Sequence, residues 1–189
     1  MTHSVESIKT FLDSYKREEI QDNSLTPAAV LMLLFEKNRD LFFLLTKRTE
    51  EVEHHKGQIS FPGGATDKRD KDIVATALRE TEEEVGMRTD SVMILGLADD
   101  IWTPTGFRVT PVVGYVPSLL PLKLNKSEVE ETLQVPLSFF LDERNERIGH
   151  REVKGRRVTI YYYTFGEFEI WGATAAIIHA FLKKLSDSQ

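Results

Sequence analysis

The stretch GQISFPGGATDKRDKDIVATALRETEEEVGM, residues 57–87, places a glycine-rich turn before a segment crowded with glutamates. Residues 72–85 are predicted to form a helix that ends at Gly86, a residue typical of helix C-termini. Like charges at helical spacing cost roughly a few tenths of a kcal/mol per pair. The acidic run therefore indicates either a solvated face or a cation that compensates the repulsion.

The helical period separates an apolar stripe from an acidic one. The stripe expected to face the core consists of Val74, Leu78, Thr81 and Val85. Glu80, Glu83 and Glu84 are expected on the opposite side, within a single turn, while Glu82 points elsewhere into solvent. Arg79 lies four residues before Glu83, a spacing that allows an ion pair.

Three carboxylates in a small volume suit a hard divalent cation such as Mg²⁺ or Mn²⁺. The preceding Gly63 and Gly64 permit backbone conformations closed to other residues and let main-chain groups approach an anion or a metal closely. The simpler alternatives are a solvated acidic face and an ordinary glycine turn. The combination of both features in one stretch favours a metal site.

Composition limits the class of protein. The 189 residues fit one domain, 41% of them are hydrophobic, and the net charge is -6. That charge, with no basic stripe interleaved with aromatics along the chain, argues against a nucleic-acid or membrane binder. Cysteine is absent, so disulfides, thiolate metal sites and cysteine nucleophiles are excluded. The N-terminus lacks a secretory pattern, and we expect a cytoplasmic protein.

Periodicity along the chain predicts a mixed sheet flanked by helices, an α/β/α fold. An amphipathic helix is expected over about residues 5–19, and a hairpin of buried strands over 28–35 and 41–48. Further strands are expected over 92–98, 108–116 and 157–165, with a short helix in VPLSFFLDER and a final helix over 173–185. Nothing divides the chain, so a single domain is predicted over residues 1–189.

The segment RETEEEVGM, residues 79–87, resembles the R-E-U-x-E-E-x-G-U signature of Nudix hydrolases, where U is a large aliphatic residue. Thr81 departs from the pattern at one U position. The general form also has Gly, five residues, Glu, seven residues and then Arg. Here Asp70 follows Gly64 at the first spacing but precedes Arg79 by eight intervening residues. The resemblance implies a Nudix-type α/β/α sandwich, with its core over about residues 28–185.

A longer pattern is similar to the coenzyme A pyrophosphatase branch of that family. It comprises LLTKR at 44–48, FPGG at 61–64, Asp67 and Asp70, TPTGFRVTPVVG at 103–114 and IWGATA at 170–175. Thr49 and Glu53 depart from the small residue and the arginine that the branch carries. The resemblance covers roughly residues 28–180. It implies metal-dependent hydrolysis of the pyrophosphate bond of coenzyme A or its thioesters, giving 3′,5′-ADP and 4′-phosphopantetheine or its acyl derivative.

The resemblance also implies roles for the acidic helix. Glu80 and Glu84 are the principal metal ligands, and Glu83 shares the cluster or orients a water, with Mg²⁺ or Mn²⁺ as the cofactor. Arg79 holds Glu83 in place, and the carbonyl of Gly64 completes the coordination shell. For the general base, the segment 124–137 offers three acids, of which we favour Glu128. The alternative is that Glu128, Glu130 and Glu131 are all solvated loop acids.

A substrate with a 3′-phosphate as well as a diphosphate needs local positive charge. Arg48, Lys56 and Arg108 are the candidates, although Lys56 and Arg108 are more typical of solvated surface cations. The resemblance adds Phe61, Gly63 and Gly64 of the FPGG turn to the substrate-binding set. His54 and His55 lie in a predicted loop without partners of metal-site spacing. Phe107, Tyr161 and Tyr163 are candidates to stack on adenine, but strand aromatics usually serve the core, and Trp171 is expected to be structural.

Three other functions stay open. One keeps the fold and the metal but acts on ADP-ribose or another nucleoside diphosphate derivative. Another is a non-catalytic nucleotide-binding module, which we disfavour because Glu80, Glu83 and Glu84 are all present. A third is a nucleic-acid-processing role, disfavoured by the acidic balance. A homodimer is compatible with the sequence, which does not fix the oligomeric state.

Overall fold

The computed structural model describes residues 3–49, 57–153 and 155–188. The helices are α1 (Val5–Ser14), α2 (Ile73–Val85), α3 (Leu137–Phe140) and α4 (Gly172–Asp187), with 3-10 turns at Thr89–Ser91 and Glu143–Asn145. The first strands are β1 (Thr26–Lys37), β2 (Asp40–Arg48), β3 (Ile59–Ser60), β4 (Gly63–Ala65), β5 (Met93–Leu97) and β6 (Ile101–Trp102). They are followed by β7 (Phe107–Val116), β8 (Val129–Pro136), β9 (Glu146–Val153), β10 (Arg156–Phe165) and β11 (Phe168–Trp171).

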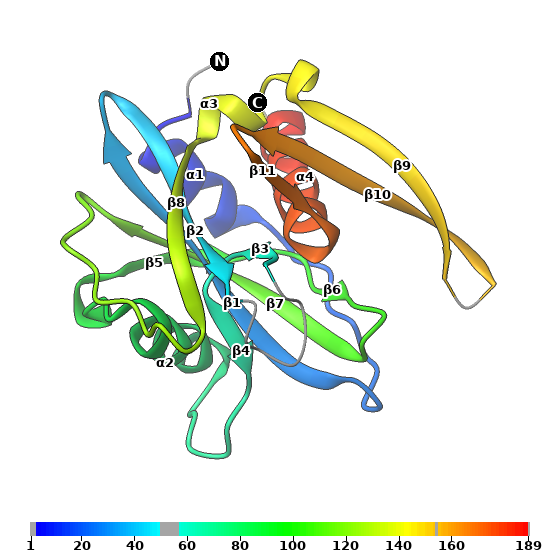
Figure 1. Cartoon of the computed structure of the whole chain (residues 1–189), viewed down its shortest axis with the longest axis horizontal. Coiled ribbons are helices and arrows are strands. Elements are labelled where there is room, and N and C mark those ends of the chain that lie inside the picture. Colours follow the sequence, from blue (N-terminus) through cyan, green and yellow to red (C-terminus); the bar gives the residue numbers. More distant parts are fainter. Residues whose placement is uncertain (1–2, 50–56, 154, 189) are drawn as a thin grey trace.

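The predicted hairpin is confirmed as β1 and β2, which pair antiparallel. Asn38 and Arg39 at its turn have φ of 53° and 64°, the left-handed geometry of a two-residue hairpin turn. β1 also pairs in parallel with β7, so the larger sheet is mixed, in the order β3-β2-β1-β7-β5 (Figure 1). β4 pairs with β1, β6 with β7 and β8 with β2.

Helices cover both faces of this sheet, as the fold prediction requires. Alternate residues of β1 belong to two separate hydrophobic clusters: Leu31 and Leu33 pack on the α2 side, and Met32 and Leu34 on the side of α1 and α4. A strand buried on both faces reads as a continuous apolar run rather than an alternating one, which explains the sequence AAVLMLLF. The α/β/α sandwich is therefore confirmed.

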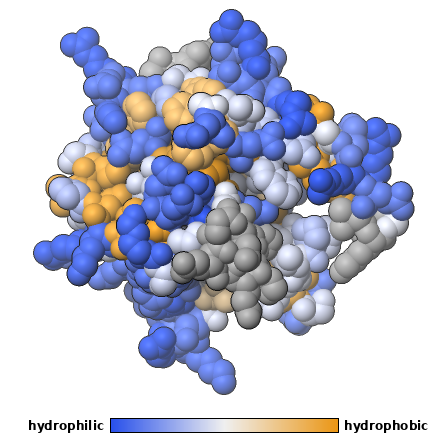
Figure 2. Space-filling view, in the orientation of Figure 1, coloured by the Kyte–Doolittle hydropathy of each residue, from blue (hydrophilic) through white to orange (hydrophobic). Residues whose placement is uncertain are grey.

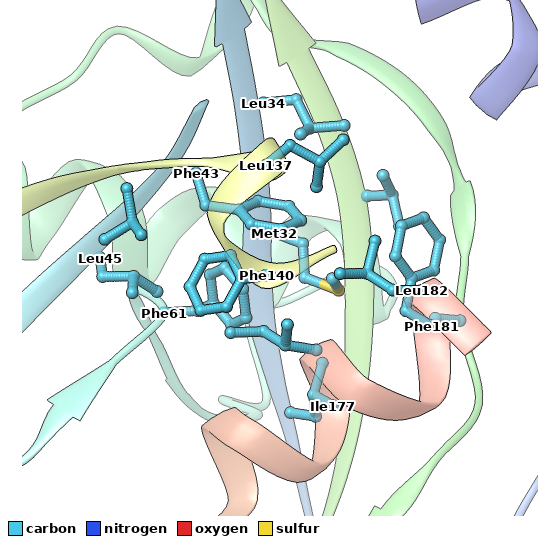
Figure 3. Packing of buried hydrophobic residues seen from close by; sticks show 14 of the residues in the cluster. Met32, Leu34, Phe43, Leu45, Phe61, Leu137, Phe140, Ile177, Phe181 and Leu182 are labelled. Carbon is cyan, nitrogen blue, oxygen red and sulfur yellow. The ribbon is translucent and has the colours of Figure 1, made fainter. Parts of the chain in front are cut away.

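The larger cluster joins the sheet to α3 and α4 (Figure 3). Phe61 is 2% exposed and packs edge-to-face on Phe43, with ring centroids 5.4 Å apart. Phe140 of α3 reaches the same group, and Ile177 and Phe181 close it from α4 (Figure 3). The FPGG turn is thereby anchored in the core through its phenylalanine.

The helix predicted over about residues 5–19 is shorter at its C-terminal end in the structure. α1 ends at Ser14, and residues 15–22 follow as an extension that forms neither helix nor strand. Two acids hold this extension: Asp99 accepts from Glu18 N at 2.7 Å, and Asp100 accepts from Ile20 N at 3.0 Å. Tertiary hydrogen bonds therefore replace the helical ones that residues 15–19 would have made.

A second sheet, β11-β10-β9, was predicted only in part, since 157–165 was the one strand expected there. Its long β9–β10 hairpin extends away from the main body (Figure 1). In the described residues, no helix is long and apolar enough to cross a membrane. Hydrophilic residues predominate on the face shown in Figure 2, and hydrophobic ones form separate patches there.

Candidate active site

The acidic helix forms as predicted and is capped at both ends. Asp72 accepts a hydrogen bond from Ala75 N at 2.8 Å, and Gly86 adopts φ 64°, ψ 23° in the left-handed region. The predicted division into apolar and acidic faces needs one correction, because the Glu84 side chain is 4% exposed. It lies one turn from the buried Thr81 and points toward the sheet rather than into solvent.

The two glycines of the FPGG turn sit where a side chain does not fit. A Cβ on Gly63 would lie 2.2 Å from the carbonyl oxygen of Ala29, across the β1–β4 pair. A Cβ on Gly64 would lie 2.5 Å from the carboxyl group of Glu80. The turn therefore brings its main chain directly against the acidic helix, as the sequence suggested.

Glu84 is a buried carboxyl group with few compensating partners. Its Oε1 lies 3.9 Å from Arg48 Nη1, and its Oε2 has no hydrogen-bond partner among the described residues. Burial, together with the neighbouring Glu80 and Glu128 carboxylates, raises the pKa of Glu84 to about 8 against the opposing effect of Arg48. A buried, unpaired carboxylate oxygen is costly, which indicates a group missing from this position.

Glu80 and Glu83 both accept hydrogen bonds from the guanidinium of Arg79. Arg79 Nη1 donates to Glu80 Oε1 at 2.8 Å and to Glu83 Oε2 at 3.1 Å, so the predicted Arg79–Glu83 ion pair is present. Burial raises the pKa of Glu80, although Arg79 opposes this effect. Glu83 is different, since 55% of its side chain is exposed.

The principal partner of Arg79 is Asp70. Arg79 Nε and Nη2 donate to the two Asp70 oxygens, each at 2.9 Å, in a bidentate pair. Thr76 Oγ1 and the Asp67 backbone N–H also donate to Asp70 Oδ2, both at 2.9 Å. Together these donors hold the pKa of the Asp70 carboxyl well below its usual range. The sequence left this role unassigned, although the spacing from Gly64 was the available signal.

Glu128 faces the acidic helix and is held there by Asn125. Asn125 Nδ2 donates to Glu128 Oε1 at 3.0 Å, and the Asn125 backbone N–H donates to the carbonyl of Glu84 at 2.9 Å. Glu130 and Glu131 lie on β8, a strand the sequence reading missed, and both pair with Lys47. Of the three candidate bases, the structure thus brings Glu128 to the Glu80–Glu84 pair.

The predicted substrate-binding residues are distributed unevenly. Arg48 lies beside Glu84, and its Nε is buried with no hydrogen-bond partner among the described residues. Arg108 instead donates to the carbonyl of Ile20 at 3.0 Å, which engages it with the N-terminal extension. Phe61, predicted to contact the substrate, is 2% exposed and belongs to the core instead. Lys56, together with His54, His55 and Glu53, lies outside the described residues.

The donor set of this site fits a hard divalent cation. Glu80, Glu84 and Glu128 repel one another electrostatically, and one buried oxygen of Glu84 is unpartnered. Oxygen donors of this kind are those that Mg²⁺ and Mn²⁺ prefer. Within residues 3–49, 57–153 and 155–188, no three acidic or histidine side chains already converge on one point. Binding an ion would therefore require these carboxylates to rearrange.

Comparison with known proteins identifies the group to which the chain is related. The NUDIX domain family matches residues 25–154, which include the FPGG turn, α2 and Glu128. This chain belongs to the Nudix family. An uncharacterized Nudix hydrolase named NudL from Photorhabdus laumondii is 38% identical over 162 residues, covering 86% of each chain. The NudL of Cronobacter sakazakii, also described as uncharacterized, is 35% identical and covers 94% of each.

Solved structures agree on the fold. A Nudix hydrolase from Alicyclobacillus acidocaldarius has a TM-score of 0.57 at 19% identity, covering 84% of this chain and 91% of that one. An Ap4A hydrolase from C. elegans has a TM-score of 0.50 at 18% identity, covering 60% and 82%. The Nudix assignment made from RETEEEVGM is therefore confirmed, and α2 is the helix that carries the Nudix signature. The enzymes of this family generally use divalent metal ions.

Proposed function

We propose that this Nudix hydrolase cleaves the pyrophosphate bond of coenzyme A or its thioesters, giving 3′,5′-ADP and 4′-phosphopantetheine or its acyl derivative. One observation carries the proposal of metal-dependent hydrolysis: the buried Glu84, one of whose oxygens has no partner among the described residues, lies beside Glu80, Glu128 and the FPGG turn. The choice of coenzyme A rests on the sequence segments LLTKR, FPGG and IWGATA. These are neighbours in space, because Thr46 contacts Ser60 and Thr174 donates to the carbonyl of Ile59.

In this proposal, Glu80 and Glu84 hold the cation, and Glu83 joins them once it leaves Arg79. When bound, a divalent metal ion supplies neutralisation of the diphosphate charge and activation of the attacking water. Arg79 is a positioning residue, because its contacts to Asp70 and Ala65 O fix the loop against the helix. In the metal-free protein its guanidinium holds Glu80 and Glu83 close together.

Glu128 accepts the proton of the attacking water as general base. Its support comes from both sides: Asn125 holds the carboxylate, and the Glu128 carbonyl accepts from Thr49 N at 3.0 Å. Arg48 adds positive charge next to Glu84, where it faces the diphosphate. The Gly63 and Gly64 main chain lines the other side of the same space.

The test is a substrate comparison with Mg²⁺ and Mn²⁺, with products identified by mass. Coenzyme A, dephospho-coenzyme A and ADP-ribose are compared at equal concentration. Higher turnover of coenzyme A, with 3′,5′-ADP as product, supports the proposal, whereas equal or higher turnover of ADP-ribose moves the assignment to the alternative substrate class. Glu84→Gln and Glu128→Gln should lose activity, and Glu82→Gln is the matched control because Glu82 lies exposed on the same helix. Near-normal turnover of Glu128→Gln would remove it as the base.

A further inference from the structure

The sheet β11-β10-β9 has one face that packs inward and one that does not. Tyr163 is 1% exposed and Ile170 is fully buried, and these two are register partners on the inward face. On that face Tyr161 also stacks on His179 of α4, with ring centroids 3.8 Å apart. The aromatic candidates Tyr161 and Tyr163 are thus occupied by packing, which leaves Tyr162, pointing the other way, as the outward one.

The outward face gathers arginines and aromatics that are far apart in sequence. Tyr162 pairs in register with Arg147 on β9 and with Trp171 on β11, so the three side chains form one row across the sheet. Arg147 lies over the Tyr162 ring, with its Cζ 3.9 Å from the centroid, and Arg151 Cζ is 6.0 Å from the Trp171 centroid. None of the described side chains on this face is buried. We call Arg147, Arg151, Tyr162 and Trp171 the β9–β11 platform.

Two further features suit this platform to a ligand. Gly149 lies on the same face, and a Cβ there would approach the Tyr162 ring to 3.1 Å, so glycine leaves room for the flat ring. Arg151 makes no hydrogen bond or ion pair among the described residues, so its charge is free for an anion. Residues 146–157 contain five Lys or Arg against two Glu, in a chain whose net charge is -6. Arg147 is paired with Glu169 on the same face, with Arg147 Nη2 2.8 Å from Glu169 Oε1, so Arg151 supplies the unpaired positive charge beside two partly exposed aromatic rings.

The platform also lies at the edge of the catalytic sheet. β11 packs beside β3, which leads directly into the FPGG turn (Figure 1). Thr174, three residues after Trp171, donates to the carbonyl of Ile59 at 3.0 Å. On β11 itself, Phe168 is contacted by Lys47, which precedes Arg48. The platform is thus connected through β3 to the FPGG turn, whose Gly64 main chain lies against Glu80.

We propose that the β9–β11 platform binds the nucleoside end of the substrate, with the purine ring stacked on Trp171 and Tyr162 and a ribose phosphate bound by Arg151. The inference rests on the proposed function, in that the substrate is an adenine nucleotide with a phosphate outside its diphosphate. Planar bases stack well on aromatic and guanidinium planes, and a phosphate is recognised by an arginine fork. A single row of residues fits one nucleotide better than a nucleic-acid strand, and the acidic balance of the chain agrees.

The test uses the fluorescence of Trp171. The chain has two tryptophans, so Trp102→Phe leaves Trp171 as the only reporter. Metal-free protein is titrated with 3′,5′-ADP, adenosine and inorganic phosphate in separate arms, and calorimetry measures the same binding. We expect quenching by 3′,5′-ADP, weaker quenching by adenosine, and none by phosphate alone. Loss of the stacking ring in Tyr162→Leu should weaken 3′,5′-ADP binding by about tenfold.

Arg151→Gln should lower the affinity for 3′,5′-ADP to that for adenosine. Because the Arg151 side chain is exposed, this substitution should not impair folding. Arg144→Gln is the control, since Arg144 is an exposed arginine paired with Asp142 outside the platform. The proposal is overturned if 3′,5′-ADP does not bind, or if calorimetry detects binding that does not quench Trp171. It is also overturned if Arg151→Gln binds 3′,5′-ADP with unchanged affinity. Tighter, steeply salt-dependent binding of a single-stranded oligonucleotide overturns it as well. If coenzyme A is not hydrolysed but 3′,5′-ADP still quenches Trp171, the platform stands and the proposed reaction falls.

Discussion

Replacing Asp70 by asparagine removes the negative charge that holds Arg79. The Asp70 side chain is 4% exposed and accepts four hydrogen bonds, two from Arg79 and one each from Thr76 and Asp67 N. Three of these donors converge on Oδ2, where an asparagine would present either its single oxygen or an N–H₂ group facing other donors. The substitution therefore leaves part of the network unsatisfied.

The magnitude follows from the burial of the two partners. Breaking a buried ion pair on one side costs about 3–5 kcal/mol. Arg79 is 23% exposed, so water replaces part of the lost interaction, and we expect the free energy of unfolding to fall by about 2–3 kcal/mol at pH 7. Urea unfolding of the metal-free protein, followed by circular dichroism, measures this difference.

The Asp70–Arg79 pair also predicts how the free energy of unfolding depends on pH. The pKa of Asp70 is depressed in the folded protein, so its contribution is fully present above the unfolded pKa of about 3.9 and is lost as the pH falls through the folded pKa. The difference in free energy of unfolding between the parent protein and Asp70→Asn should therefore shrink by about 1 kcal/mol when the pH is lowered from 7 to 3. Asp67→Asn is the control, because it breaks an exposed ion pair with Arg69. It should change the midpoint of urea unfolding far less than Asp70→Asn does. The reasoning would be refuted if Asp70→Asn had the same urea midpoint as the parent protein. It would also be refuted if the difference in free energy of unfolding stayed constant between pH 7 and pH 3.

Three other perturbations test the site and the second sheet. Glu84→Gln removes the cost of burying a carboxyl group whose pKa is raised to about 8, so it should raise the melting temperature of metal-free protein by a few degrees, as thermal unfolding can show. It should also abolish the rise that Mn²⁺ produces in the parent protein; a rise that survives would argue against Glu84 as a ligand. Gly64→Ala places a Cβ against Glu80 and should lower kcat by about 10- to 100-fold with an unchanged circular dichroism spectrum; normal kcat would contradict the close approach. Glu146→Ala leaves the buried hydroxyl of Tyr163 without its partner at 2.6 Å and should cost about 1–3 kcal/mol in urea unfolding, and no loss would show that the hydroxyl finds another acceptor.

Local chemistry made much of the site predictable. The helix carrying the Nudix signature, its cap at Gly86 and the Arg79–Glu83 pair follow from spacing within a few residues, and the structure has all three. The tight turn at Gly63 and Gly64 was likewise readable, because a pair of glycines signals close backbone approach. Family membership followed from the same short stretch.

Contacts between distant segments were beyond the sequence. Nothing in the order of residues placed Arg108 on the carbonyl of Ile20. The row formed by Arg147, Tyr162 and Trp171 exists only because three strands pair in one register. The sequence alone determined the β1–β2 hairpin, the acidic helix and the chemistry that this helix can support, but it did not reveal β8, β9 or β11. Only the tertiary structure decided which side chains meet, because strand register and sheet topology depend on burial summed over the whole core.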